Sequence, residues 1–336
     1  MRINPGAGIP GGEVVIECEG FDTSDLRSCG VWFGHAQAQL VGASSRRVLA
    51  IVPEVEGDAR ETQVALESNG ERSASVPFIV GAKLAEDLHL VANPAFDPDD
   101  GSLYVTRSGP RGQQMPVTIF RIDASGAIDA FSGDITNPTG IAFDKSGQMF
   151  VTSRMDGTVY RLTAFKETVA FANNLGVATG LAFDHAGRMC VGDRTGTIYR
   201  INDIGEEKAW AQLEPSVSAY HLAFGPEDDL YMTGPTVSSF DAVMRVDENG
   251  SPDVFYRGLG RPQGLAFDRD GNLYVAASLS GRRGIVRISP DGSEAEITVA
   301  GMNVVGLAFS ATGSMAVATN EAVYSLPLGI RGTLLK

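Results

Sequence analysis

The sequence predicts an all-β protein, with a small β-sandwich over residues 1–81 and a six-bladed β-propeller over residues 82–336. The main observation is a repeat, because the motif Gly-Leu-Ala-Phe-Asp or a variant of it occurs six times. A second is that short stretches of alternating apolar and polar residues are bounded by Asp, Gly and Asn turns, as in strands joined by hairpins. The third is the total of 40 glycines without a collagen period, which indicates many tight turns.

The repeats have a period of about 42 residues, the length of one propeller blade. Their phenylalanines are Phe96, Phe143, Phe183, Phe224, Phe267 and Phe309. Each repeat divides into four short strands. The first three are exemplified by residues 264–267, 272–276 and 285–287, and the fourth, outer strand by residues 254–256 of the preceding repeat. In the motif strand, Leu and Phe point to one face and Ala to the other, so a bulky face meets a small one where blades converge. A single repeat cannot bury these faces, and the ring therefore has to close.

The sixth blade lacks one strand, because the chain ends soon after residues 323–326. Two segments are able to supply it. One is the C-terminal stretch 332–335, and the other is the stretch 83–90 that precedes the first repeat. In the second case the two ends of the ring share one sheet.

The repeat pattern Gly-(Ile/Leu)-Ala-Phe-Asp-x-x-Gly-x-(Leu/Met)-(Tyr/Phe)-Val resembles that of NHL-repeat and gluconolactonase-like propellers over residues 90–326. The resemblance implies the fold, and it leaves function open, since such propellers include lactonases, lyases and non-catalytic binding proteins.

Residues 1–81 lack the repeat and show short strands with Gly and Pro punctuation, which predicts a sandwich. The order of Pro, Gly-Gly, Gly-Phe, Val-x-Phe-Gly, Val-Pro, Asn-Gly and Pro-Phe along this stretch resembles the IPT/TIG immunoglobulin-like domain. The resemblance implies an immunoglobulin-like β-sandwich that acts as a spacer or docking module. Cys18 departs from the family by replacing a small residue. Cys18 and Cys29 lie in neighbouring expected strands, so either a disulfide or two buried thiols fits, and we expect thiols.

The net charge of −14 argues against nucleic acid as a partner, because an acidic surface repels phosphates. No apolar run approaches the length of a membrane span, and the N-terminus lacks a secretory signal. As written, the chain is expected in the cytoplasm, or in the periplasm or outside the cell if a leader has been trimmed. Oligomeric state stays open.

Gluconolactonase-like propellers hold a divalent cation at the channel mouth, with a Glu from the first blade and Asn and Asp from others. A hard cation needs several oxygen ligands, usually including carboxylates. The two residues at the entry of each inner strand contain no acid here; Ala92 stands near the place of the Glu, and Gln263 near that of an Asp. We therefore expect no cofactor, and a divalent cation in the channel is disfavoured.

The candidate ligand-binding residues lie at the channel mouth and rim. At the entries to inner strands they are Asn93, Thr139, Thr179, Tyr220, His221 and Gln263, and after the second strands they are Arg107, Arg154, Asp193 and Arg194. Arg154 and Arg194 match between adjacent blades, with Arg107 one residue out of register, and guanidiniums so placed can clamp a carboxylate or phosphate. They can equally be solvated loop residues or pair with Asp193. His221 interrupts a glycine position and serves either as a base or donor in the channel or as a side chain that plugs it.

The sequence contains no recognisable nucleophile and base pair. We expect a non-catalytic binding or interaction protein, whose propeller mouth and rim bind a small polar ligand, anionic or neutral, or a protein partner. The alternative is a gluconolactonase-like hydrolase or a lyase that uses His221, Asp193, Asp241 or Glu321.

Overall fold

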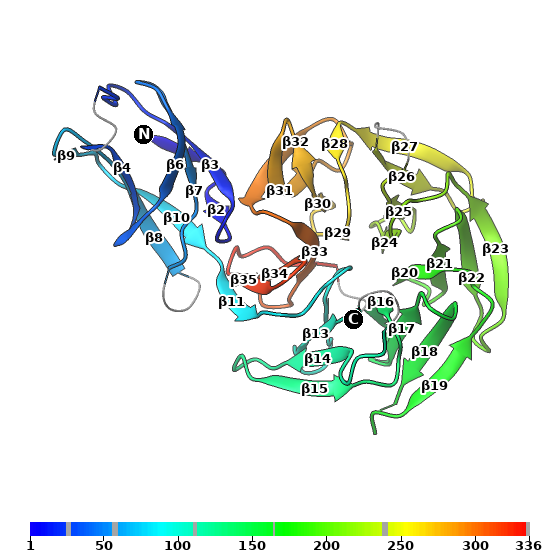
Figure 1. The fold of residues 1–336 in the computed structure, drawn as a ribbon. Helices are drawn as coiled ribbons and strands as arrows, with labels where there is room; N and C mark the ends of the chain where they lie inside the picture. Colours follow the sequence, from blue (N-terminus) through cyan, green and yellow to red (C-terminus); the bar gives the residue numbers. More distant parts are fainter. Residues whose placement is uncertain (25–27, 56–59, 110–112, 164, 237–240, 334–336) are drawn as a thin grey trace.

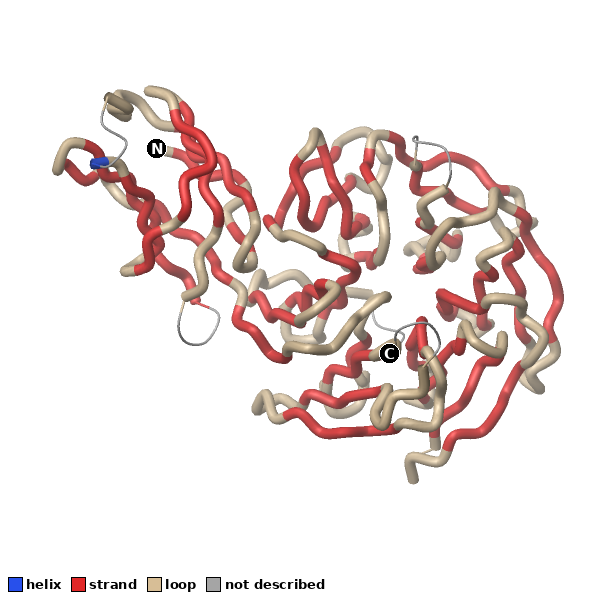
Figure 2. Tube along the Cα trace, viewed as in Figure 1, coloured by secondary structure: helices blue, strands red, loops and turns tan. Residues whose placement is uncertain are grey.

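The computed structural model describes residues 1–24, 28–55, 60–109, 113–163, 165–236 and 241–333. Apart from the 3-10 residue Ser28, the regular elements of these residues are β-strands (Figures 1 and 2), which confirms the all-β prediction. No helix in this part of the chain is long and apolar enough to cross a membrane.

The larger part of the chain forms blades arranged around an axis (Figure 1). Blade 1 contains β12 (Ala95–Phe96), β13 (Leu103–Thr106), β14 (Ile119–Ile122) and β15 (Ile128–Ser132). Blade 2 contains β16 (Pro138–Phe143), β17 (Met149–Ser153), β18 (Thr158–Leu162) and β19 (Thr168–Ala172). Blade 3 contains β20 (Ala178–Phe183), β21 (Met189–Asp193), β22 (Thr197–Ile201) and β23 (Glu207–Gln212).

The second half of the ring repeats this order from the axis outward. Blade 4 contains β24 (His221–Phe224), β25 (Leu230–Thr233), β26 (Ala242–Val246) and β27 (Pro252–Arg257). Blade 5 contains β29 (Leu265–Phe267), β30 (Leu273–Leu279), β31 (Arg282–Ile288) and β32 (Ala295–Ala300), with the short β28 (Leu259–Gly260) also paired to β30. Blade 6 contains β33 (Val304–Phe309), β34 (Met315–Thr319) and β35 (Val323–Leu326). This is the propeller that the repeat predicts.

The outermost strand of blade 6 comes from the beginning of the ring. Strand β11 (Ala82–Ala85) runs antiparallel to β35, with Ala82 opposite Ser325 and Lys83 opposite Tyr324. Of the two expected sources of this strand, the segment near residue 83 is therefore confirmed. The C-terminal stretch instead reaches blade 5, where Gly332 bridges Asp268 and the amide of Thr333 donates to the carbonyl of Phe267. Residues 334–336 lie outside the described part.

The repeated phenylalanines hold neighbouring blades together. Four of the six, Phe143, Phe183, Phe267 and Phe309, pack edge-on against an aromatic ring from the second strand of the preceding blade. The centroids of Phe309 and Tyr274 are 5.0 Å apart, and those of Phe183 and Phe150 are 5.4 Å apart. These edge-to-face pairs add to the burial of apolar area. Where the inner strands converge, a Cβ on Gly264 would lie 2.6 Å from the Cα of Gly306, so glycine is required by close approach.

Residues 1–80 form two sheets around one apolar core. The first has the order β1 (Arg2–Asn4), β3 (Glu13–Glu17), β7 (Arg47–Ile51), β6 (Gln39–Ala43). The second has the order β2 (Ala7–Gly8), β10 (Val76–Val80), β8 (Arg60–Ser68), β4 (Gly30–Phe33), β5 (Ala36–Gln37), with β9 (Glu71–Arg72) beside β8. Phe33 and Phe78 meet edge-on in the core, at a centroid distance of 5.1 Å. Cys18, Cys29 and Cys190 are free thiols; Cys29 is buried as expected, whereas Cys18 is only half-buried.

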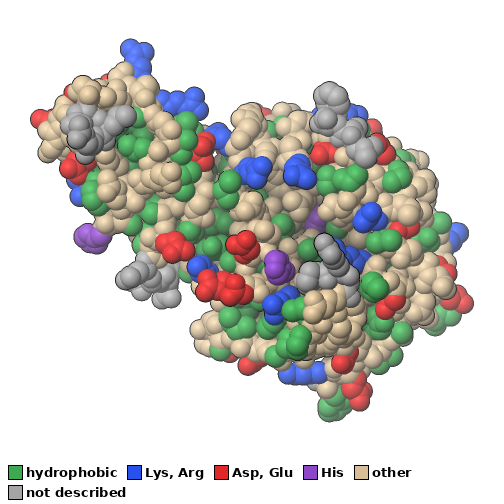
Figure 3. Space-filling view, in the orientation of Figure 1, with side chains coloured by type: hydrophobic (Ala, Val, Ile, Leu, Met, Phe, Trp, Pro, Cys, Tyr) green, Lys and Arg blue, Asp and Glu red, His purple; other side chains and the backbone are tan. Residues whose placement is uncertain are grey.

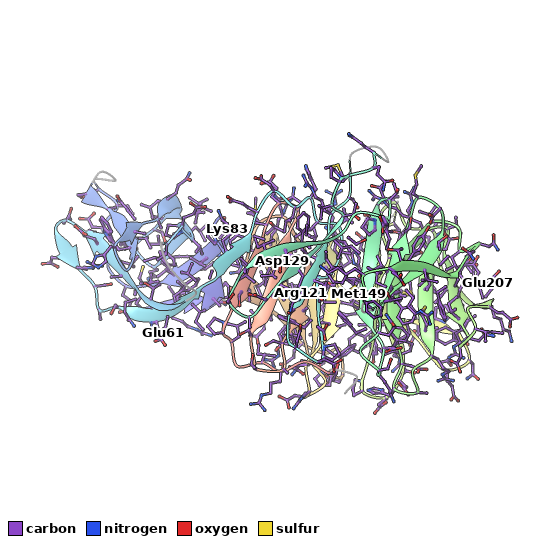
Figure 4. All side chains as sticks on the ribbon, turned by 90° about the horizontal axis from the view of Figure 1, so that it is seen from below. Glu61, Lys83, Arg121, Asp129, Met149 and Glu207 are labelled. Atoms are coloured by element: carbon purple, nitrogen blue, oxygen red, sulfur yellow. The ribbon has the colours of Figure 1, made fainter. Side chains whose placement is uncertain are left out.

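One sheet continues from these N-terminal strands into the ring. Strand β2 pairs with β10 on one side and with β32 of blade 5 on the other, with Gly8 opposite Ala300. The buried side chain of Ile9 packs into the core between blades 5 and 6. Lys83, labelled in Figure 4, forms ion pairs with Glu54 at 3.3 Å and Glu86 at 3.0 Å beside this junction. The N-terminal sheets consequently lie beside the ring at its outer edge (Figures 1 and 4).

Candidate functional site

The candidate residues lie on one face of the ring, which we call the upper face. It carries the connections that enter the inner strands and the loops that join second to third strands. Figure 3 shows the molecule from this side, with a hollow near the ring axis and Lys and Arg side chains around it. The turns of the Asp-x-x-Gly type lie on the opposite, lower face.

The hollow leads into a central channel lined by the inner strands of all the blades, with a volume of about 240 Å³. Its wall consists largely of backbone and of Ala, Leu and Phe side chains from the repeated motif. Asn93 and His221 are polar lining residues near the upper end, whereas His185 and Thr333 line the lower end. The channel is thus an apolar tube with a few polar groups.

His221 is the first residue of β24 and is 4% exposed. Burial in this apolar wall lowers the pKa of its imidazole to about 4, because the charged form would lose its hydration. Its ring makes no side-chain hydrogen bond to the residues that the structure describes. The imidazole is therefore neutral near pH 7, and a group with so low a pKa is a weak general base there.

Several of the other entry residues bind backbone groups of neighbouring blades. The side-chain Nδ2 of Asn93 donates to the backbone carbonyl of Leu265 at 2.8 Å, and its Oδ1 accepts from the backbone amide of Leu307 at 3.0 Å. These bonds connect blade 1 to blades 5 and 6. The buried hydroxyl of Thr179 donates to the carbonyl of Gly192 at 3.0 Å and accepts from the amide of Tyr220 at 3.1 Å. These two side chains already have the partners that a ligand would compete with.

Thr139 and Tyr220 are also buried. The hydroxyl of Thr139 lies 3.4 Å from the carbonyl of Asn137, and the phenol of Tyr220 donates to the carbonyl of Glu214. Burial raises the pKa of Tyr220 to about 12, so its hydroxyl stays protonated as a donor.

Arg154 and Arg194 occupy equivalent places in blades 2 and 3, as the repeat predicts. The amide of Arg154 donates to the carbonyl of Asn137, and that of Arg194 to the carbonyl of Val177, so both follow the same turn. Burial first, and the charge of Arg194 second, lower the pKa of Arg154. Within the described residues neither guanidinium forms an ion pair or a side-chain hydrogen bond. Two like charges therefore lie near each other without a compensating carboxylate.

Arg107 lies one residue before the position of Arg154 and Arg194, as expected. In blade 1 the equivalent backbone hydrogen bond is made by the next residue, Ser108, whose amide donates to the carbonyl of His89. Arg107 matches the place of Asp193 instead. Its Nε is buried and has no hydrogen-bond partner in the described structure. Buried donors are nearly always satisfied in folded proteins, so this nitrogen calls for a partner that is not part of the described chain.

Asp193 is buried, and its carboxylate accepts from the amides of Val177 at 2.8 Å and Thr195 at 3.2 Å, and from the Thr195 hydroxyl. These bonds fix the connection into β20, and no ion pair of Asp193 with an arginine is formed among the described residues. Gln263 donates its backbone amide to the carbonyl of Ala276, and its side chain lines a separate pocket over blades 4 to 6.

A divalent cation of the kind that the propeller resemblance implies has few ligands at the mouth. Ala92 offers no side-chain oxygen, and the amide oxygen of Asn93 already accepts from Leu307. Across the described part of the chain, no three His, Cys, Asp or Glu side chains form a group that could hold a metal ion. The residues present do not fit the cation, because a hard ion needs several free oxygens.

Of the residues considered for an enzyme, Asp241 accepts from the amide of Thr236 at 3.0 Å in the loop after β25, and Glu321 lies in the turn between β34 and β35. Neither lines the central channel.

Sequence comparison of the blades missed two arginines on the upper face, Arg261 and Arg283, which line the same separate pocket as Gln263. The signal was available, because Arg261 lies only two residues before Gln263.

No family model matches this chain, and no curated protein matches it. Among solved structures, an auxiliary nutrient binding protein from Bacteroides ovatus is 16% identical with a TM-score of 0.55, over 97% of this chain and 96% of that one. A gluconolactonase from Xanthomonas campestris is 16% identical with a TM-score of 0.60, over 73% of this chain and 88% of that one. Virginiamycin B lyase from Staphylococcus aureus is 15% identical with a TM-score of 0.51, over 74% and 87%. The chain therefore shares the fold of gluconolactonase-like and virginiamycin B lyase-type propellers.

Proposed function

We propose that this protein is a non-catalytic binding protein that holds a small, polar, anionic ligand at the upper mouth of its propeller. The observation that carries this is the pair Arg154 and Arg194. Arg154 is partly buried beside a second guanidinium, both effects disfavour its charge, and no carboxylate among the described residues offsets them. An anion placed between the two would remove that repulsion and accept bidentate hydrogen bonds.

The groups around this pair suit recognition better than chemistry. Arg107 supplies a buried Nε that has no hydrogen-bond partner among the described residues, and His221 supplies a neutral imidazole to the channel below. A polar ligand that reaches both would hydrogen-bond to side chains that lack such a partner within the described residues. The polar groups of Asn93, Thr179 and Asp193 serve the fold, so in this proposal they position the mouth instead of contacting ligand.

The two parts of the chain have separate roles in the proposal. Residues 82–336 form the binding propeller, and residues 1–81 form an immunoglobulin-like sandwich of the IPT/TIG type that serves as a spacer or docking module. A structural neighbour that spans both parts is a nutrient binding protein, which supports a binding role. The net charge of −14 makes nucleic acid an unsuitable partner.

Calorimetric titration with gluconate, a small polyhydroxylated anion, tests the proposal. We expect Arg154→Glu and Arg194→Glu each to abolish binding, because either change places a carboxylate where the ligand's anion would lie. Arg161→Glu is the matched control, since it makes the same charge change at an exposed site of the same blade, in β18. Equal affinity in all of these variants would reject the proposed site.

The competing function is a gluconolactonase-like hydrolase or lyase, which the fold of two enzyme neighbours allows. Hydrolysis of gluconolactone, measured with added Ca²⁺ or Zn²⁺ and lost in His221→Gln, would overturn the non-catalytic assignment.

A further inference from the structure

A second pocket, which we call the blade-5 pocket, opens on the upper face over blades 4, 5 and 6 and has a volume of about 390 Å³. This lies within the range of small-molecule sites, roughly 300–1,000 Å³. Its buried floor includes Ala277, Val304 and Val305. The polar side chains around that floor include those of Ser218, Arg261, Gln263, Arg283, Asn303 and Asn320.

The charge of this lining is positive and uncompensated. Arg261 and Arg283 come from two different parts of blade 5: Arg261 lies in the connection into β29, and Arg283 is the second residue of β31. No Asp or Glu occurs among the described lining residues, and neither arginine forms an ion pair or side-chain hydrogen bond with the described chain. Figure 3 shows basic side chains over the region that Figure 1 labels β30 and β31. In a chain with a net charge of −14, two guanidiniums that have no partner in the described part of the chain and lie over an apolar floor form a local site for an anion.

The backbone of Arg261 gives an independent observation. Its φ is 48°, in the left-handed region that side chains other than Asn, Asp and Gly seldom adopt. Asn137 and Asn303, which stand at the same place before the inner strands of blades 2 and 6, have φ values of 50° and 54°. Asparagine is therefore the residue that this turn favours, and an arginine there bears strain that its backbone role does not explain.

We propose that the blade-5 pocket binds a small oxyanion, the carboxylate or phosphate group of a polar metabolite, between Arg261 and Arg283. The two guanidiniums supply bidentate donors that match either group. The amides of Gln263, Asn303 and Asn320 supply hydrogen bonds to the rest of the ligand, and the floor of Val304 and Val305 excludes water beneath it. This site lies on the half of the ring opposite blades 2 and 3, so it is independent of the site proposed at Arg154 and Arg194.

Calorimetric titration of the full chain with inorganic phosphate, and separately with succinate, tests this inference. We expect binding of at least one ion, and the ion that binds identifies the group as phosphate or carboxylate. Arg261→Asn removes the cation but restores the residue that the turn favours, so we expect a melting temperature equal to or above that of the parent. Its affinity for the bound ion should fall at least about tenfold, as for loss of a charged hydrogen-bonding partner. Arg283→Gln should weaken binding to a similar extent.

Arg282→Gln is the matched control. Arg282 neighbours Arg283 on β31 but donates to the carbonyl of Asn4 at 3.3 Å and does not line the pocket. The inference is overturned if neither ion binds, if Arg261→Asn binds as tightly as the parent, or if Arg282→Gln weakens binding equally. Loss of binding in the double variant Arg154→Glu/Arg194→Glu, together with full affinity in Arg261→Asn, would show that the ion binds at the channel mouth. That result would also overturn the inference.

Discussion

The neutral imidazole in the channel makes a quantitative prediction about the pH dependence of stability. Burial lowers the pKa of His221 from 6.5 to about 4. Because the folded value lies below the unfolded one, unfolding takes up a proton between these pH values, and the stability declines as the pH falls through that window. This lowering of the pKa corresponds to about 3 kcal/mol, most of which is lost by pH 4.

Two measurements check this. The chain has four histidines, so an NMR titration of the imidazole resonances can follow each ring separately, with His221→Gln assigning the one of interest. We expect that resonance to titrate near pH 4. In urea unfolding, the stability difference between the parent and His221→Gln should change by about 3 kcal/mol between pH 7 and pH 4. A resonance that titrates near pH 6.5, or parallel stability curves for parent and His221→Gln, would refute the burial argument.

Two further predictions concern the convergence of the inner strands. Asn93→Ala removes hydrogen bonds to Leu265 and Leu307 and should lower the free energy of unfolding by about 2–4 kcal/mol in urea, whereas Asn249→Ala in an exposed turn should change it little. Gly264→Ala places a Cβ 1.9 Å from Oδ1 of Asn93 and should lower it by at least about 3 kcal/mol, against a small effect for Gly6→Ala, where nothing lies within 4 Å. Unchanged urea midpoints for Asn93→Ala or Gly264→Ala would contradict the interblade contacts described here.

The repeated motif determines most of the ring, because each of its residues satisfies a packing requirement that recurs between neighbouring blades. Phe267 has to fill the space beside Tyr231, and Gly264 has to admit the backbone of the next blade. Ring closure was harder to predict. Both candidate segments for the missing strand of blade 6 contain suitable apolar residues, and strand pairing depends on where the chain ends meet in space. The sheet shared by Gly8 and Ala300 had no local signal at all, since the pairing joins residues far apart in sequence.

The candidate site was predictable to the extent that it follows the repeat. Equivalent positions placed Arg154 and Arg194 together and set Arg107 out of register, and the structure agrees on that register. Sequence alone did not reveal that the side chain of Asn93 hydrogen-bonds to the backbone of Leu265 and Leu307, because those partners belong to other blades. The blade-5 pocket was missed for the same reason, since its lining comes from loops of three blades.

Polar side chains near the axis and cationic side chains farther out have different roles in this ring, and the difference indicates where a ligand can bind. Near the axis, converging strands leave backbone amides and carbonyls that need partners, and short polar side chains such as Asn93 and Thr179 supply them. One step outward, the connections between second and third strands do not need a long cationic side chain to satisfy backbone groups. Arg154 and Arg194 lie in these loops and Arg283 lies at the start of β31, and none of the three forms an ion pair with a carboxylate of the described residues. The N-terminal sheets attach at the outer edge of blade 5 and not across the upper face, so these loops face solvent (Figure 1). Substitutions in them can therefore change the ligand without disturbing the interblade hydrogen bonds that hold the ring together.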